Sequence, residues 1–361
     1  MKKILPIYIA FLVVSVVMYS CREDFELNAP YKDNTVVFGL IDQAVDTQFI
    51  KINKSFLGEG NNTAYAHIND CTIYQNIVAR IDEIKNGVVQ NSYPLSEIYV
   101  KNLEPGIFYT DSQKVYYFVP QTNIDQDATY RLIASVNEGS KEVSAETKVV
   151  KEVVFNQTFV TLLSSGIRFK NATTGNYTNI EIKWKSTQNG KRYTPFICFY
   201  YTEHTSSGVE EKVINWQLAT QESFNVSGNQ DMSAVVTGGS FYGMIASRVP
   251  NDPSVIKRVI GRFEFFVSVA DEDLNTYIKL NAPAQGVVTE RPVYTNVSNG
   301  IGIFGSRYTA GLLGIPTGPG TFKHIKLDKP SVEELCEGQY TNQLRFCTDS
   351  LAWQFESYFC N

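Results

Sequence analysis

Short apolar runs, separated by polar residues and turn residues, dominate the chain after residue 33. The run TVVFGLID at 35–42 has the character of a buried strand, and the run at 47–56 alternates apolar and polar residues with period two. Asn86-Gly87, flanked by apolar residues, is the strongest short-range signal for a tight hairpin. The pattern predicts strands at 34–42, 47–56, 64–75, 77–84, 114–120, 129–136 and 141–150. Many short strands with turns between them predict an immunoglobulin-like or fibronectin-like sandwich over residues 34–151.

A second β-rich block covers residues 152–328, and Gly, Asn, Ser and Thr clusters separate its apolar runs. These runs predict strands at 153–163, 166–171, 178–186, 194–204, 211–219, 233–238, 257–270 and 276–281. Acidic residues favour a first helical turn, so a short helix is expected to start near Asp271, and another turn or two within 331–338. The predicted fold class is all-β: the immunoglobulin-like sandwich, then a second β-sandwich or barrel-like domain, then a C-terminal tail at 329–361.

The N-terminus has the pattern of an export signal. Lys2 and Lys3 are followed by an apolar run from 4 to 17, which is too short to span a bilayer as a helix. A small residue, Ser20, then precedes Cys21. We predict a lipoprotein signal peptide at 1–20, lipidation of Cys21 and a polar tether at 21–33. The alternatives are a soluble-secretion signal and an uncleaved anchor.

Composition narrows the class of partner. The chain has 21 Tyr and 22 Phe, which favour strands and exposed sheet faces. Its net charge is −5 and it contains no block of Lys and Arg, so a nucleic-acid partner is not expected.

The six cysteines fit an oxidising compartment. Cys71 and Cys198 stand alone in strand-like runs and are expected to be buried thiols. Cys336, Cys347 and Cys360 crowd the tail, where a disulfide would tie down the chain end, and the first expectation is Cys336–Cys347. Their spacing does not match a zinc knuckle.

The glycines Gly300, Gly302 and Gly305 spell the G-x-G-x-x-G of a dinucleotide-binding turn. That turn opens a helix, and the Gly- and Pro-rich sequence after Gly305 cannot hold one. We therefore expect these glycines to let a strand bend or pack closely, and we expect no cofactor.

No motif points to a catalytic or metal site. The three histidines, His67, His204 and His324, lie far apart, and neither H-E-x-x-H nor G-x-S-x-G occurs. A glycosidase needs only two carboxylates close in space, which sequence spacing does not show. Acidic residues in predicted turns, which could also bind calcium, are Asp125, Asp127, Glu210, Glu211, Asp271, Glu272 and Asp273. We expect them to be solvated, and we assign no catalytic, cofactor-binding or metal residue.

Aromatic residues stand on consecutive positions at 199–201 and 265–266, with Phe196 and Phe263 close to these runs. Successive residues of a strand point to opposite faces of a sheet, so one aromatic row must lie outside the core unless another layer covers it. The candidate interaction surface is Phe199, Tyr201 and, from the late Gly-rich segment, Phe304.

Cys21 with its acidic leader and three further stretches resemble a family of Bacteroidetes outer-membrane lipoproteins that has no established activity. The stretches are VVFGLIDQAVDTQFIKINKSFLG at 36–58, TYRLIASVNEGSKEVSAETKV at 129–149 and YTNVSNGIGIFGSR at 294–307. The resemblance implies an exported, lipid-anchored β protein with an N-terminal immunoglobulin-like domain, of a kind often encoded near TonB-dependent receptors. It supplies no catalytic residues.

We therefore predict a non-enzymatic, lipid-anchored outer-membrane protein that faces the cell exterior. Its expected partners are the membrane, through the lipid, and a TonB-dependent transporter or an extracellular glycan or peptide. One alternative is a surface glycan hydrolase, whose signature would be a cleft with two carboxylates, one of raised pKa. The other is an adhesin or pilus-type subunit that polymerises by strand exchange.

Overall fold

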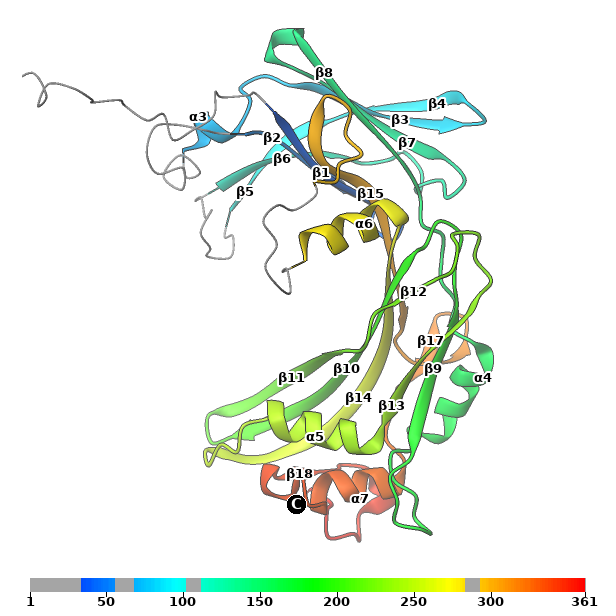
Figure 1. Ribbon diagram of the computed structural model, residues 1–361. Helices are drawn as coiled ribbons and strands as arrows, with labels where there is room; N and C mark the ends of the chain where they lie inside the picture. The colour runs from blue at the N-terminus through cyan, green and yellow to red at the C-terminus, as the bar shows by residue number, and fades with distance from the viewer. Residues whose placement is uncertain (1–33, 56–67, 102–111, 283–292, 361) are drawn as a thin grey trace, which may run out of the picture.

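A computed structural model describes residues 34–55, 68–101, 112–282 and 293–360 (Figure 1). The predicted signal peptide, Cys21 and the tether lie outside the described residues, as does His67. Strands make up 50% of the structure and helices 17%, which confirms the all-β class. No helix in the described ranges has the length and apolar character needed to cross a membrane.

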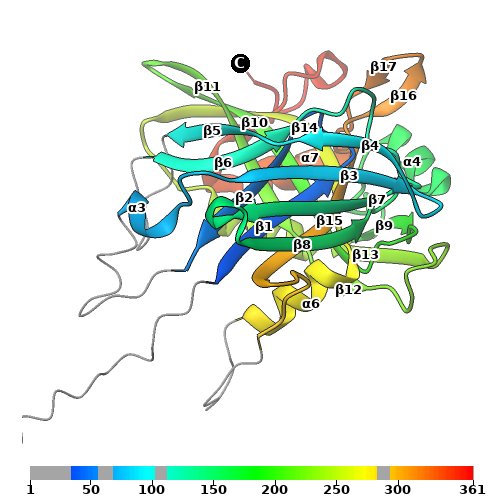
Figure 2. The ribbon, with the colours of Figure 1, turned by 90° about the horizontal axis from the view of Figure 1, so that it is seen from above.

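The first part of the chain forms a two-layer sandwich. One layer contains β1 (Thr35–Asp42), β2 (Gln48–Lys54), β6 (Ser112–Phe118) and β5 (Ser96–Lys101). The other has the order β4 (Val88–Pro94), β3 (Val78–Lys85), β7 (Thr129–Val136) and β8 (Lys141–Lys148). Figure 2 shows the strands of this second layer crossing over β1 and β2. Alternate residues of both layers, such as Val37, Ile50, Ile81 and Leu132, form one core.

The turn signals in this sandwich are confirmed. Asn86 and Gly87 join β3 to β4 with φ of 52° and 76°, the left-handed values that a two-residue hairpin turn of the primed type needs. A short 3-10 turn, η1 (Asn137–Gly139), joins β7 to β8. The strand expected at 64–75 is wrong in its described part, because residues 69–72 form the short helix α3 (Asn69–Thr72).

Long curved strands continue the first layer into the second part of the chain. They are β11 (Gly208–Gln217), β10 (Arg192–Thr205), β14 (Val255–Ala270) and β15 (Gly300–Leu312). The sheet runs without interruption in the order β11-β10-β14-β15-β1-β2-β6-β5. The short strands β12 (Gln221–Glu222) and β18 (Phe346–Cys347) pair with β10 and β14.

The strand β15 belongs to both halves of the molecule. Its first part pairs in parallel with β1, from Thr35 opposite Gly300 to Asp42 opposite Arg307. Its second part pairs antiparallel with β14, up to Phe265 opposite Leu312. The sandwich expected at 34–151 is therefore completed by residues from the segment assigned to the second domain, and the two units do not divide at residue 152.

A second layer covers one face of the long strands (Figure 1). The antiparallel pair of β9 (Asn179–Lys185) and β13 (Asp231–Thr237) lies there with three helices, α4 (Gln157–Leu162), α5 (Gly238–Arg248) and α7 (Lys329–Glu337). The smaller elements are η2 (Leu163–Ser165), β16 (Ile315–Gly318), β17 (Thr321–Lys323), η3 (Asn342–Leu344) and η4 (Leu351–Trp353). Large side chains such as Trp184, Phe241 and Phe263 fill the core between the layers.

Side-chain caps explain where the helices start. The helix expected near Asp271 is α6 (Glu272–Asn281), and the Asp271 carboxylate accepts the Leu274 backbone N–H at its N-terminus. The strand expected at 276–281 is therefore wrong, because these residues lie in α6. The turn expected within 331–338 lies in α7. The strand expected at 153–163 is wrong, because Asn156 caps α4 through the N–H groups of Thr158 and Phe159.

The disulfide joins Cys347 to Cys360, so the expected Cys336–Cys347 bridge is wrong. Helical spacing places Cys336 on the face of α7 that also buries Val332 and Leu335, and the thiol therefore points into the core. The chain end returns beside β18, where the Cys360 N–H donates to the Thr348 carbonyl at 2.9 Å. Of the other thiols, Cys198 is buried as expected, whereas Cys71 in α3 is only half-buried.

Candidate functional site

The aromatic residues predicted as an interaction surface lie in the core instead. Phe199 is 1% exposed, Tyr201 5% and Phe304 0%. In β10, Phe199 and Tyr201 point toward the second layer, where Phe199 packs against Phe241 of α5. Phe304 completes the core of the first sandwich. These three residues therefore contact other parts of the same chain and form no docking surface.

The other aromatic row faces the inside of the curve that β10 and β14 make in Figure 1, and it is half-buried. Phe196 and Phe266 stack on each other with ring centroids 4.8 Å apart and an interplanar angle of 9°. The Arg262 guanidinium lies 3.8 Å from the Tyr200 ring centroid, and both residues hydrogen-bond to Glu264. Because these ring faces are already occupied within the chain, this row offers little free apolar surface to a ligand.

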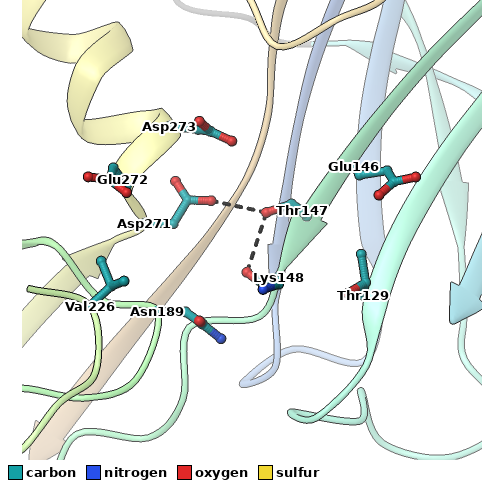
Figure 3. Close-up of a pocket in the computed structure, with 9 residues that line it drawn as sticks. All are labelled: Thr129, Glu146, Thr147, Lys148, Asn189, Val226, Asp271, Glu272 and Asp273. Atoms are coloured by element: carbon teal, nitrogen blue, oxygen red, sulfur yellow. Dashed lines mark hydrogen bonds between the residues drawn. The ribbon is translucent and has the colours of Figure 1, made fainter. Parts of the chain in front are cut away.

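An acidic pocket of about 330 Å³ lies where the two halves of the molecule meet (Figure 3). It brings together the predicted triplet at 271–273, from the start of α6, with residues of β7 and β8. Figure 3 shows the Asp271 carboxylate directed at Thr147 of the first sandwich. Its lining is Thr129, Glu146, Thr147, Lys148, Asn189, Val226, Asp271, Glu272 and Asp273.

Asp271 joins three segments of the chain. Its carboxylate accepts hydrogen bonds from the Leu274 N–H at 2.7 Å, the Ser306 N–H at 2.6 Å and the Thr147 hydroxyl at 3.0 Å. Burial raises the pKa of Asp271 to about 6, because desolvation of the charged form outweighs these hydrogen bonds. Both of its oxygens are bound by the protein, so the residue acts in the structure as a clamp between α6, β15 and β8.

Five of the six remaining acidic residues singled out in the sequence are also held within the chain. Asp273 accepts from the Tyr294 hydroxyl and the Asn296 amide. The ion pairs are Asp125–Lys85, Asp127–Lys151, Glu210–Lys212 and Glu211–Arg262. His204 lies 3.2 Å from the Thr202 hydroxyl, and His324 is exposed. Across the described ranges, no three His, Cys, Asp or Glu residues are grouped so that they could hold a metal ion.

The largest concave feature among these candidates is a groove of about 870 Å³ beside α6. Its wall on the sandwich side is the outer face of β1, the β1–β2 turn and the start of β2; β15 forms the floor and α6 the opposite wall. The lining residues are Phe38, Gly39, Leu40, Asp42, Val45, Asp46, Thr47, Gln48, Phe49, Leu274, Tyr277, Ile278, Ile303 and Arg307. We call this feature the α6 groove.

Exposed hydrophobic side chains gather around the α6 groove. Phe38 is 40% exposed, Val45 43%, Phe49 52% and Ile278 37%. The Phe38 ring meets the edge of the Tyr277 ring at a centroid distance of 6.0 Å, and this contact links the two walls. Clusters of exposed apolar side chains are unusual on monomeric proteins and mark interaction sites.

Polar contacts hold the groove in shape. The buried Gln48 amide accepts from the Asp42 N–H and donates to the carbonyls of Asp42 and Val45, which fixes the β1–β2 turn. The Asp42 carboxylate accepts from the Arg307 guanidinium at 3.1 Å, which ties β1 to β15 at one end of the groove. Pre-formed apolar concavities with a few fixed polar groups are typical binding sites.

The sequence contains a signal for this groove that the prediction missed. Phe38 and Phe49 have the opposite phase to the buried residues Val37, Ile41 and Ile50 of the same strands. Alternation assigns both positions to the outer face of the sheet, and an aromatic residue on that face indicates an interaction surface. No family model matches the chain, and a search of curated proteins finds no similar one.

Proposed function

We propose that the protein is a non-catalytic binding protein, anchored in the outer membrane by a lipid on Cys21 and facing the cell exterior. In this proposal an apolar polypeptide segment of a membrane partner, such as a TonB-dependent transporter, lies in the α6 groove. The observation that carries it is the set of four exposed hydrophobic side chains around a pre-formed groove of about 870 Å³.

The lining favours a polypeptide over a glycan. Leu40, Val45, Ile278 and Ile303 are aliphatic, and they suit the apolar side chains of a peptide better than the hydroxyl groups of a sugar. The exposed Asp46 and Arg307 at the rim provide charges that select and orient such a segment.

The proposed anchor fits the position of the groove in the chain. β1, which supplies Phe38, is the first strand after the predicted tether. A tether of this length, even fully extended, spans at most about 47 Å. A lipid on Cys21 would therefore keep the groove close to the membrane surface and to proteins embedded in it.

Site-specific photo-crosslinking in cells tests the binding role. A benzoylphenylalanine at position 49 is expected to crosslink an outer-membrane protein. The same probe at Phe355, which is 94% exposed in the C-terminal tail at the far end of the molecule, is the matched control and is expected to give no specific product. Equal products at both positions, or none at position 49, would contradict the proposal.

The anchor has its own test. Intact-mass analysis of the mature protein is expected to show acyl chains on Cys21, and Cys21→Ala is expected to release the protein from the membrane fraction. A mature protein without fatty acid would refute the anchor and would leave the groove proposal standing for a soluble protein.

One observation favours glycan hydrolysis as a second candidate. The acidic pocket contains four carboxylates, and burial raises the pKa of Asp271 to about 6, as a general acid would need. Release of reducing sugar from surface glycans that is lost in Asp271→Asn, with the fold retained, would establish this candidate. Because the protein itself occupies both oxygens of Asp271, we expect no such activity.

A further inference from the structure

The strand β5 ends the long sheet and leaves one edge unpaired in the described structure. It follows β6 as the last strand of the sheet order, at the opposite end from β11 (Figure 1). All six of its residues are exposed, and three consecutive ones are apolar: Ile98 at 44%, Tyr99 at 48% and Val100 at 37%. Such an edge is a template for pairing with another strand.

Three other strand edges, those of β11, β4 and β8, carry protection that β5 lacks. β11, at the far end of the same sheet, has the charged run Glu210, Glu211 and Lys212 in its length. β4 has a polar centre and ends in Pro94, which donates no hydrogen bond. β8 is covered by Ser298, whose N–H and carbonyl pair with Ser144. Of these four edges, β5 is the one that combines exposure along its whole length with an apolar centre.

The sequence of β5 is complementary to itself when it is reversed. If two copies pair antiparallel about Tyr99, then Glu97 of each lies opposite Lys101 of the other, and Ile98 lies opposite Val100. A register centred on Ile98 places Glu97 opposite Tyr99 and brings no opposite charges together. Cross-strand pairs of opposite charge and of apolar residues stabilise a sheet and define its register.

We propose that two copies of this chain associate through β5, in an antiparallel pair centred on Tyr99, so that their sheets join into one. The contact is isologous, as in most homodimers, because the same strand acts on both sides. The apolar residues supply the buried centre, and the two Glu97–Lys101 pairs select the partner and the register.

Both charged residues are available for this pairing. Glu97 is 55% exposed at its side chain and binds Lys114 through one carboxylate oxygen at 2.5 Å, which leaves the other oxygen open. Lys101 is exposed and has no ion pair with any residue that the structure describes. A six-residue edge is a small contact, so we expect a reversible dimer in concentration-dependent equilibrium with the monomer.

Charge exchange across the proposed axis gives a selective test on the full chain in mild detergent. Glu97→Lys or Lys101→Glu turns both attractive pairs into repulsive ones, so each variant alone should dimerise roughly 10- to 100-fold more weakly in sedimentation. An equimolar mixture of the two variants should form a heterodimer, because both lysines of the Glu97→Lys chain then face glutamates of the Lys101→Glu chain. Capture of the untagged variant by a tagged one measures this.

A disulfide probe keeps the test independent of folding effects in the charge variants. Residues directly opposite across an antiparallel pair have Cα atoms about 4.5–5.5 Å apart, within disulfide range. Tyr99→Cys should therefore give a crosslinked dimer on mild oxidation, whereas Ile98→Cys, which faces Val100, should not crosslink to itself. Wild type is the background control for the native thiols. A monomeric wild type at every concentration, no mixed heterodimer, or equal crosslinking at positions 98 and 99 would overturn the proposal.

Discussion

Replacing Asp271 with Asn should change the stability of the protein in a way that depends on pH. The substitution keeps the shape of the side chain and removes its ionisation. Asn accepts through one oxygen only, so at least one of the three hydrogen bonds that Asp271 accepts is lost. The loss costs about 1–2 kcal/mol at every pH, because a cap or a buried N–H is left without its acceptor.

The ionisation of Asp271 adds a contribution of opposite sign. Its pKa is raised from 3.8 to about 6, so the folded state holds the proton more tightly than the unfolded chain does. The resulting stabilisation is complete below pH 3.8 and is lost as the pH rises through 6. By linkage, the free energy of unfolding of the wild type falls by about 2.5 kcal/mol between about pH 4 and pH 8. The Asn side chain does not ionise, so the variant does not undergo this fall.

The assay is urea unfolding followed by tryptophan fluorescence at intervals from about pH 4 to pH 8, the window in which the linkage acts. We expect Asp271→Asn to be less stable than wild type at the acidic end and as stable or more stable at the alkaline end. Glu272→Gln, in the same helical turn, controls for the removal of one negative charge. A difference between wild type and Asp271→Asn that stays constant with pH, or that grows as pH rises, would refute the reasoning.

Two further substitutions test the backbone and the tail. Gly302→Ala should lower the free energy of unfolding by about 3 kcal/mol or more, since Gly302 has φ of +116° and an added Cβ would lie 2.0 Å from the Val37 carbonyl oxygen. The matched control is Gly243→Ala on α5, where an added Cβ would meet open space, and it should be neutral or slightly stabilising. Cys360→Ser should cost about 3 kcal/mol by opening the loop closed by the Cys347–Cys360 bond. During unfolding of the same protein, Cys336 should resist alkylation until the protein unfolds, because burial raises the pKa of its thiol to about 12. Ready labelling of Cys336 in the native protein would contradict the last expectation, and a Gly302→Ala variant as stable as wild type would contradict the first.

The sequence predicts a feature correctly where a few adjacent residues determine the conformation by themselves. Asn86-Gly87 supplies the left-handed φ values of its turn, and Asp271 caps the helix expected after it. The glycines at 300–305 were expected to permit bending or close packing, and Gly302 does so against β1. Each of these features depends on a few adjacent residues, so no knowledge of distant partners was needed.

Features that depend on distant segments were not predictable in this way. Alternation in β10 separates Phe199 and Tyr201 from Phe196 and Tyr200, but it does not say which face the second layer will cover. Three cysteines in a short tail leave the pairing open until the buried face of α7 is known. The α6 groove combines strands near residue 40 with a helix near residue 275, and nothing local connects them.

The most consequential of these distant contacts is the pairing of β15 with β1, and it predicts that residues 34–151 do not fold alone. Without the segment 293–312, which contains β15, the whole length of β1 loses its neighbour on one side, and the sandwich core loses Phe304 and Val297. Removing a fully buried Phe side chain costs about 3–5 kcal/mol, which is comparable to the whole stability of a small domain. A fragment of residues 34–151 should therefore show poor amide protection, and a synthetic peptide of residues 293–312 added in excess should restore it. A peptide with Phe304→Ala and Gly302→Ala is the control and should not. A fragment that is fully protected without the peptide would show that the first sandwich is complete by residue 151, and that β15 only lies against it.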